Sequence, residues 1–435
     1  MGYRGKKMKF AVVFVLAAML AVPATAATVV TADRYLDVNS GRYVENPAIF
    51  IDDTGHITSV GDARTIRWDA SVKHIDLAGE TLLPGLIDMH THLGPANIGG
   101  YRYLEFTDSF WPIVATSTAR DMLNGGFTTM RVVGSGDWAD VGLKQAIEAG
   151  YVVGPRIVPA GHALGATGGH CDDTYLPPSM QKKDKEEGIG DSPEELRYQV
   201  RRQRKFGAEV IKVCATGGVF SRGDHPGQQQ LTEEELRAIA DEAHMQGLRV
   251  AAHAHGADGI NAAIRAGIDT IEHASLLNDE SIKLAKARAR PVWFSMDIKN
   301  TDYTQAEGRK NGELEENIRK DAEIGQVQRD NFRKAHAAGV RMIFGSDAGV
   351  MPHAMVPQQF RVMVQYGMTP LDAIQAATRN AAEALGRTDV GTIAPGAYGD
   401  LIAIRGDPIR DVTLLEKVDA VIKGGVLVKG RSAQP

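Results

Sequence analysis

The stretch PGLIDMHTHLG, residues 84–94, places His90 and His92 at the end of an apolar run. Side chains of a β-strand alternate with a period of two, so both imidazoles would point into the same space. A protein core can hold one hydrogen-bonded histidine, but two on the same face of a strand are typical of a metal site. The rest of the chain decides between simple packing and metal binding.

Seven more apolar, β-rich runs follow along the chain, and helical stretches separate them. A capping box of Thr232 and Glu235 begins one of these helices (232–247), and Gly386 ends another (370–386). Eight strand–helix alternations in about 300 residues predict an α/β fold, a (β/α)8 TIM-like barrel, with a doubly wound open sheet as the alternative. The eight runs are 81–92, 127–136, 155–165, 208–218, 248–256, 268–275, 290–297 and 340–349.

The two ends of the chain differ from this pattern. Residues 27–80 and 389–435 read as short β-segments divided by Asp/Gly turns, and we predict that they form the two halves of one small β-sandwich domain, with the barrel (81–388) inserted between them. Residues 1–26 have the basic, apolar and small-residue parts of a signal peptide, ending in an Ala-Thr-Ala cleavage site. We therefore expect a periplasmic or secreted protein without stable membrane insertion; an uncleaved anchor is the alternative.

Composition limits the classes of function. The 435 residues are 43% hydrophobic and 24% charged, as in ordinary globular proteins, and the net charge of −5 gives no support to a nucleic-acid binder. The only two cysteines, Cys171 and Cys214, do not make a disulfide framework. Cys214 lies in an apolar run, so we expect a small buried core residue and no bridge to Cys171.

Polar residues with metal-binding chemistry lie at the ends of five of the eight runs. In a barrel of this type the carboxyl ends of the strands meet at one mouth, where active sites lie. Four or more imidazoles with one carboxylate suit a borderline metal such as zinc. A lysine among cations would be repelled, unless carbon dioxide converts it to a carbamate anion that bridges two metals. These residues are His90, His92, Lys212, His253, His255, His273 and Asp347.

The chain resembles the amidohydrolase superfamily, and within it the binuclear Xaa-Pro dipeptidase and ochratoxinase-like amidase branch. The resemblance covers nearly the whole chain after residue 26. It rests on PGLIDMHTHLG, VIKVCATGG, AAHAHG, EHAS, FGSDAG and GTIAPGAYGDLIAI, in this order and spacing.

The resemblance implies a role for each of the clustered residues. Two divalent metal ions, expected to be Zn²⁺, would bind there: one held by His90, His92 and Asp347, and the other by His253 and His273. Lys212, carboxylated by carbon dioxide, would bridge the two. His255 would lie in the substrate pocket or behind the ligands. A metal-bridging hydroxide would attack the substrate carbonyl, and Asp347 would carry the proton to the leaving amine.

The loops that follow the strands carry the residues expected to contact substrate. The candidates are His162, His170, Arg222, His225 and His353, with His162 and Arg222 assigned to a substrate carboxylate. The branch usually has glycine where this chain has Cys171, directly after TGGH. The charged segment 302–325 reads as a solvated helix, or alternatively as a lid over the site.

These features predict an exported zinc enzyme that hydrolyses the amide bond of dipeptides or N-acyl amino acids. Its partners would be small peptides or N-acyl amino acids, and we expect a homo-oligomer. Two alternatives stay open. One is an imidazolonepropionase- or deaminase-like ring hydrolase, which usually has one metal and no bridging lysine. The other is a non-catalytic exported binding protein.

Overall fold

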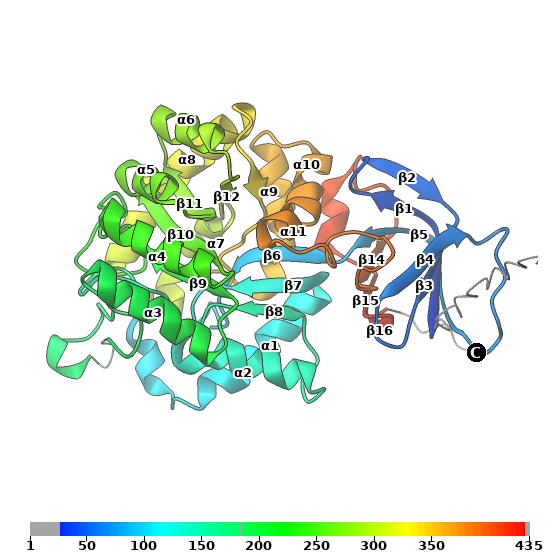
Figure 1. Cartoon of the computed structure of the whole chain (residues 1–435), viewed down its shortest axis with the longest axis horizontal. Helices are drawn as coiled ribbons and strands as arrows, with labels where there is room; N and C mark the ends of the chain where they lie inside the picture. The colour runs from blue at the N-terminus through cyan, green and yellow to red at the C-terminus, as the bar shows by residue number, and fades with distance from the viewer. Residues whose placement is uncertain (1–26, 182–184, 431–435) are drawn as a thin grey trace, which may run out of the picture.

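The computed structural model describes residues 27–181 and 185–430, and Figure 1 shows parallel strands ringed by helices beside a separate β-sheet. The predicted signal peptide lies outside the described residues. Within the described part of the chain, no helix is both long and apolar enough to cross a bilayer.

Strands from both chain ends share the separate sheet, at the right of Figure 1. Its order is β16-β15-β14-β5-β1-β3-β4, and β2 pairs with β1. β14 runs antiparallel to β5, which places Ile402 opposite Leu83. Hydrogen bonds connect these strands into one sheet, so the β-sandwich stays a prediction. The strands are β1 (Thr28–Asp37), β2 (Arg42–Glu45), β3 (Pro47–Ile51), β4 (Ile57–Asp62), β5 (Lys73–Pro84), β14 (Leu401–Ile404), β15 (Ala420–Lys423) and β16 (Val426–Lys429).

The remaining strands are parallel and lie in two sheets, β6-β7-β8 and β13-β12-β11-β10-β9. Each corresponds to one of the eight apolar runs. The first run is divided, because residues up to Pro84 belong to β5 and only the rest forms β6. The strands are β6 (Leu86–Thr91), β7 (Phe127–Val132), β8 (Arg156–Pro159), β9 (Val210–Cys214), β10 (Arg249–Gly256), β11 (Thr270–Leu276), β12 (Trp293–Ser295) and β13 (Met342–Ile343).

Backbone hydrogen bonds join the two parallel sheets on both sides. After β8, Leu164 donates to the carbonyl of Lys212 (2.8 Å) and accepts from the amide of Cys214 (2.8 Å). On the other side, the amide of Asp347 donates to the carbonyl of His90 (2.8 Å). These contacts link the two sheets at both edges, and the parallel pairing within each sheet gives its strands the same direction.

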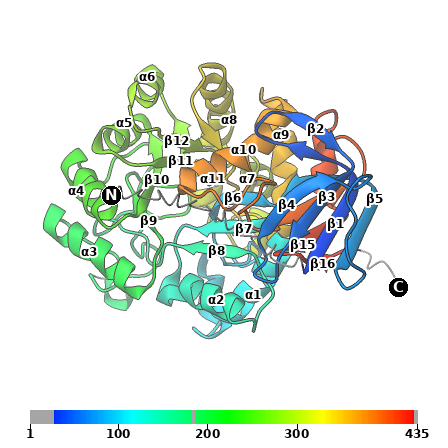
Figure 2. The same cartoon turned by 45° about the vertical axis from the view of Figure 1, so that its right-hand side comes forward.

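Helices connect the parallel strands and pack outside them, as Figure 2 also shows. The predicted capping box of Thr232 and Glu235 begins α4. The helix expected over 370–386 is two helices, because Thr378 leaves the helical conformation and its hydroxyl bonds the carbonyl of Ile374 (2.7 Å). The α-helices are α1 (Phe110–Asn124), α2 (Ala139–Glu148), α3 (Pro193–Phe206), α4 (Glu233–Met245), α5 (Ala257–Ala266), α6 (Asp279–Ala287), α7 (Asn300–Asn311), α8 (Glu315–Ala337), α9 (Gln359–Gln365), α10 (Pro370–Ala376) and α11 (Arg379–Leu385). Short 3₁₀ turns are η1 (Gly100–Glu105), η2 (Gly136–Trp138), η3 (Pro178–Met180), η4 (His353–Gln358) and η5 (Val412–Glu416).

One expectation about the cysteines is wrong. Cys171 and Cys214 form a disulfide, although Cys214 is buried as expected. The long loop after β8 folds back along β9, where Leu164 pairs with Val213, and so brings Cys171 to the end of that strand. Gly165 permits the close approach, since a Cβ there would lie 2.8 Å from Cβ of Cys171.

Candidate metal centre

The carboxyl ends of the parallel strands enclose a cavity of about 490 Å³. All the side chains predicted to form the metal centre line it, although they come from five separate segments of the chain. β6 and the residue after it supply His90 and His92, and β9 supplies Lys212. β10, β11 and the turn after β13 supply the rest: His253, His255, His273 and Asp347.

One group of donor atoms is formed by His90, His273 and Asp347, whose ligand atoms lie within 4.8 Å of one another. Oδ1 of Asp347 is 3.4 Å from Nε2 of His90 and 3.3 Å from Nε2 of His92. Burial raises the pKa of Asp347, but the two imidazoles outweigh this and hold it below its ordinary value. The carboxylate is therefore ionised and directed at the imidazoles.

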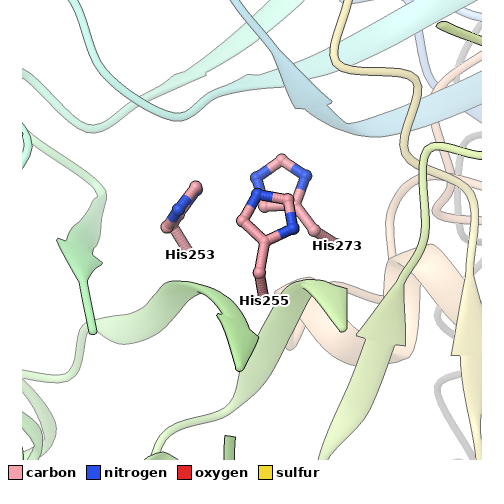
Figure 3. A group of neighbouring side chains, drawn as sticks. All are labelled: His253, His255 and His273. Carbon is pink, nitrogen blue, oxygen red and sulfur yellow. The ribbon is translucent and has the colours of Figure 1, made fainter. Parts of the chain in front are cut away.

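A second group consists of His253, His255 and His273, again with donor atoms within 4.8 Å of one another. Figure 3 shows the three imidazoles gathered above the ends of their strands, with His255 beside His273. The rings of these two are nearly parallel, with centroids 4.6 Å apart. Burial lowers the pKa of both His253 and His255 well below the ordinary value. Neutral imidazole is the form that binds a metal.

Every imidazole of the cluster has one ring nitrogen directed at a protein oxygen, which leaves the other nitrogen to face its neighbours. A histidine that donates one N–H in this way presents the opposite lone pair to a metal. In the described part of the chain, Nε2 of His90 is buried without a hydrogen-bond partner. The donor set therefore fits divalent metal ions. The five contacts are His90 Nδ1 to Glu272 Oε2 (3.0 Å), His92 Nδ1 to Gly134 O (3.4 Å), His253 Nε2 to Gly217 O (3.1 Å), His255 Nδ1 to Ser275 Oγ (2.8 Å) and His273 Nδ1 to Asp297 Oδ1 (2.8 Å).

Lys212 reaches the same cavity from the middle of a buried strand and is 4% exposed. Burial lowers the pKa of its amine to about 8, against the opposing effect of the carboxylates of Glu272 and Asp347. A substantial share of this amine is neutral near pH 8, and a neutral amine is the form that reacts with carbon dioxide. The sequence placed Lys212 correctly with the histidines.

A buried ion pair below the metal cluster escaped the sequence analysis. Nη2 of Arg131 on β7 lies 2.7 Å from Oε1 of Glu272, whose other oxygen faces Nδ1 of His90. Both side chains are almost fully buried. Burial raises the pKa of Glu272, but Arg131 and His90 more than offset this and keep it well below its ordinary value. The signal in the sequence was an acid inside an apolar strand, directly before His273.

Asp297, which follows β12, faces Nδ1 of His273 as Glu272 faces Nδ1 of His90. Asp297 was not identified from the sequence either. Besides facing the imidazole, it accepts hydrogen bonds from Asn300 on α7 (2.5 Å) and Gln328 on α8 (3.2 Å). Gln328 also donates to the carbonyl of His273 (3.2 Å). The charged segment after the seventh strand is therefore more than a solvated helix, because α7 and α8 supply one wall of the cavity. Its role as a lid stays a prediction.

The residues predicted to contact substrate lie in different places. His162 and His170 line the cavity. Arg222 is on the surface and donates to the hydroxyl of Tyr101 (2.5 Å), and His225 is also exposed; neither lines the cavity. His353 is buried behind the site, with Nε2 2.7 Å from the carbonyl of His92. The assignment of these five residues to substrate stays a prediction.

Comparisons with known proteins agree with this geometry. The sequence profile of the amidohydrolase family matches residues 81–428. Ochratoxinase from Aspergillus niger is 34% identical over 388 residues, covering 81% of this chain and 77% of its own. A solved Xaa-Pro dipeptidase with methionine bound in its active site has a TM-score of 0.86 and 35% identity, covering 93% of this chain and 100% of its own.

A solved prolidase complexed with N-methylphosphonate-L-proline has a TM-score of 0.84 and 32% identity, over 93% of this chain and 100% of its own. Such neighbours imply a TIM-barrel-like arrangement of the parallel strands. The chain belongs to the amidohydrolase family, in the branch with ochratoxinase and Xaa-Pro dipeptidase, and is a metal-dependent hydrolase of carbon–nitrogen bonds.

Proposed function

We propose that this chain is an exported binuclear zinc enzyme that hydrolyses the amide bond of dipeptides or N-acyl amino acids and releases the C-terminal amino acid. The observation that carries the proposal is the set of imidazoles that each use one nitrogen within the protein and present the other to a shared cavity. The names of the relatives, ochratoxinase and Xaa-Pro dipeptidase, support an amide substrate with a C-terminal amino acid.

In this proposal His90, His92 and Asp347 hold one metal, His253 and His273 hold the other, and carboxylated Lys212 joins them. When bound, two zinc ions lower the pKa of water toward neutrality and polarise a carbonyl oxygen. Lys212 suits carboxylation because its side chain is buried and lines the cavity shared by the histidines. Its conversion to a carbamate would supply the anion that a cluster of cations needs.

Asp347 is the group that moves the proton. It has two imidazole neighbours at 3.3–3.4 Å, and its other oxygen, Oδ2, is 3.4 Å from Nδ2 of Asn300. An ionised carboxylate in this position can accept the proton of the attacking water and return it to the leaving amine. We assign His255, which lines the cavity beside the six proposed ligands, to hydrogen bonding of the substrate.

The cavity suits a substrate of dipeptide size, since small-molecule sites have volumes of about 300–1,000 Å³. Its apolar side includes Trp111, Val219 and Phe220, and its polar side includes Asn300 and Gln328. We retain His162 as a contact for the substrate carboxylate because it reaches the cavity. Arg222 would reach it only after a rearrangement of its loop.

The remaining proposals concern organisation. We propose that the two hydrogen-bonded parallel sheets form one closed (β/α)8 barrel over 81–388, and that 27–80 and 389–435 form the accessory β-domain. We further propose removal of residues 1–26 on export to the periplasm or medium, and assembly into a homo-oligomer. Protease mapping, secretion of the full chain and light scattering would test these points.

Metal content and a substrate screen test the proposed function together. Protein expressed with zinc and bicarbonate should contain about two metal equivalents and hydrolyse some dipeptides or N-acyl amino acids. About one equivalent with ring-hydrolase activity would favour the deaminase-like alternative, and none would favour a binding protein. Lys212→Ala should lose both turnover and metal; unchanged turnover would refute the bridge. Lys423→Ala, which removes a half-buried amine from the accessory sheet, controls for general damage.

Paired variants test the choice between two neighbouring histidines. His253→Asn should lower the metal content by about one equivalent, whereas His255→Asn should keep both metals and raise KM. The opposite result would exchange the roles of the two residues without removing the binuclear centre.

A further inference from the structure

The Cys171–Cys214 disulfide lies in the wall of the cavity, beside the candidate metal ligands. Cys214 is the last residue of β9, two residues after Lys212, and it pairs in register with His253 on β10. Side chains two apart on a strand share a face, so Cys214 and Lys212 point the same way. The disulfide is therefore part of the site and not a structural cross-link far from it.

On its other side the disulfide holds the long loop that follows β8. Within this loop Gly165 donates to the carbonyl of Gly188 (3.2 Å) and Gly190 donates to the carbonyl of Gly165 (3.0 Å), and hydrogen bonds from Gln199 and Asn317 tie the loop to α3 and α8. This loop is joined to β9 by the backbone pairing of Leu164 with Val213 and by the covalent bond between Cys171 and Cys214. Loops of this length without regular structure are commonly functional.

His170, directly before Cys171, is the residue that this connection positions. Its ring stacks on the ring of His253, with centroids 4.1 Å apart and 18° between the planes. Nδ1 of His170 lies 2.9 Å from Oγ of Ser221, and its amide donates to Oε1 of Gln230 (2.9 Å). Glycine at 218 leaves room for the ring, because a Cβ there would lie 2.2 Å from it.

We infer that the Cys171–Cys214 disulfide is a positioning element for substrate binding: it fixes His170 in the cavity wall, and its reduction weakens substrate binding. The hydrogen bonds of His170 hold the ring only while its loop stays close to β9. The proposed metal ligands lie on or directly after β6, β9, β10, β11 and β13, not on this loop, and the pairing of Leu164 with β9 does not need the disulfide. Loss of the disulfide should therefore raise KM and leave kcat and metal content nearly unchanged.

A trialkylphosphine provides the reduction without adding thiols that would bind zinc. It breaks the S–S bond and takes the oxygen of one water to become the phosphine oxide, while the two protons of that water end on the sulfurs of Cys171 and Cys214. We expect the reduced holoenzyme to show a KM raised about tenfold or more, with kcat within about threefold. The double variant C171S/C214S should show the same change and no longer respond to the phosphine.

Several comparisons separate positioning from other effects. H170A should reproduce the increase in KM, and adding it to C171S/C214S should raise KM no further, as expected for residues that act as one unit. T167A, which removes an exposed hydrogen bond to Asp191 in the same loop, should leave KM unchanged. If the double variant loses thermal stability but keeps its KM, the inference is wrong. If only the reduced wild type loses activity, thiolate capture of zinc is the cause and the inference is also wrong.

The inference depends on the proposed function only for the choice of substrate. Hydrogen exchange supplies a readout without turnover: in the reduced protein the amides of residues 164–181 should exchange faster, while those of β9 and β10 stay protected. Unchanged exchange in this loop would overturn the positioning role even if the enzyme is active. Faster exchange of this loop in a reduced protein that cleaves no amide would support the positioning role of the disulfide and refute the proposed function.

Discussion

Replacement of Glu272 by glutamine tests whether the ion pair beneath the metal cluster supports the site. The substitution keeps the size of the side chain but removes the charge that faces Arg131 and His90. The guanidinium of Arg131 would remain buried without a counter-charge, and breaking a buried pair in this way generally lowers the free energy of unfolding by about 3–5 kcal/mol. Other acceptors reduce the loss, since Arg131 also donates to Oγ1 of Thr270 (3.0 Å) and to the carbonyl of Met89. We therefore expect about 3 kcal/mol, at the lower end of that range.

Urea unfolding of metal-free protein measures this loss, because metal binding would otherwise add to the stability of the folded state. Glu315→Gln is the matched control: Glu315 forms a two-pronged pair with Arg309 (2.7 and 3.0 Å), but both side chains are more than 60% exposed. Because solvent screens this exposed pair, Glu315→Gln should leave the free energy of unfolding nearly unchanged. Equal losses in the two variants would refute the reasoning. Chelator competition should also show zinc binding weakened about 10- to 100-fold in Glu272→Gln, because His90 loses the partner that orients it.

Three other changes have expected outcomes. Gly142 lies on the exposed face of α2, and a Cβ added there would have nothing within 4 Å. Gly142→Ala should therefore raise the melting temperature and increase the free energy of unfolding by about 0.5–1 kcal/mol. Asp269→Asn should lower the free energy of unfolding at pH 7 by about 2–3 kcal/mol, since the buried carboxylate lies against the guanidinium groups of Arg249 (3.2 Å) and Arg290 (2.9 Å). Folding lowers the pKa of Asp269 despite its burial. The stability that the carboxylate contributes is therefore lost as the pH falls through its pKa in the folded protein. Unfolding measured against pH should show the difference in free energy between variant and wild type shrinking below about pH 4. Reduction of the disulfide between Cys171 and Cys214, 43 positions apart, should lower stability in denaturant titrations by about 4 kcal/mol; no change would show that the loop is held without it.

The sequence was most informative where a residue type is rare in its surroundings. A lysine or a pair of histidines inside an apolar strand has few structural explanations, so Lys212 and His90 could be placed in the site before the structure was known. Period-two alternation then predicts which side chains share a face, and the barrel pattern predicts that the ends of distant strands meet.

The sequence was least informative about contacts between segments far apart in the chain. Arg131 and Glu272 are 141 positions apart, and neither has a local signature that marks the other as its partner. The disulfide was missed for the same reason, because the pairing of Cys171 with Cys214 depends on a loop that folds back along β9. Loop residues such as Arg222 were assigned by their chemistry alone, and their direction depends on turns that residue type does not determine.

At the candidate metal centre, three residues other than glycine adopt backbone conformations that their residue types disfavour. His273, Ala274 and Asp347 have φ values of 67°, 47° and 54°, in the left-handed region that residues with a Cβ seldom adopt. Such conformations persist only where surrounding contacts determine them, and they concentrate at functional sites. His273 is held by Asp297 at its ring and by Gln328 at its carbonyl, and it belongs to both groups of donor atoms. The residue shared by the two groups is thus also a strained one, which is expected if the protein, and not the metal, sets the position of the ligands.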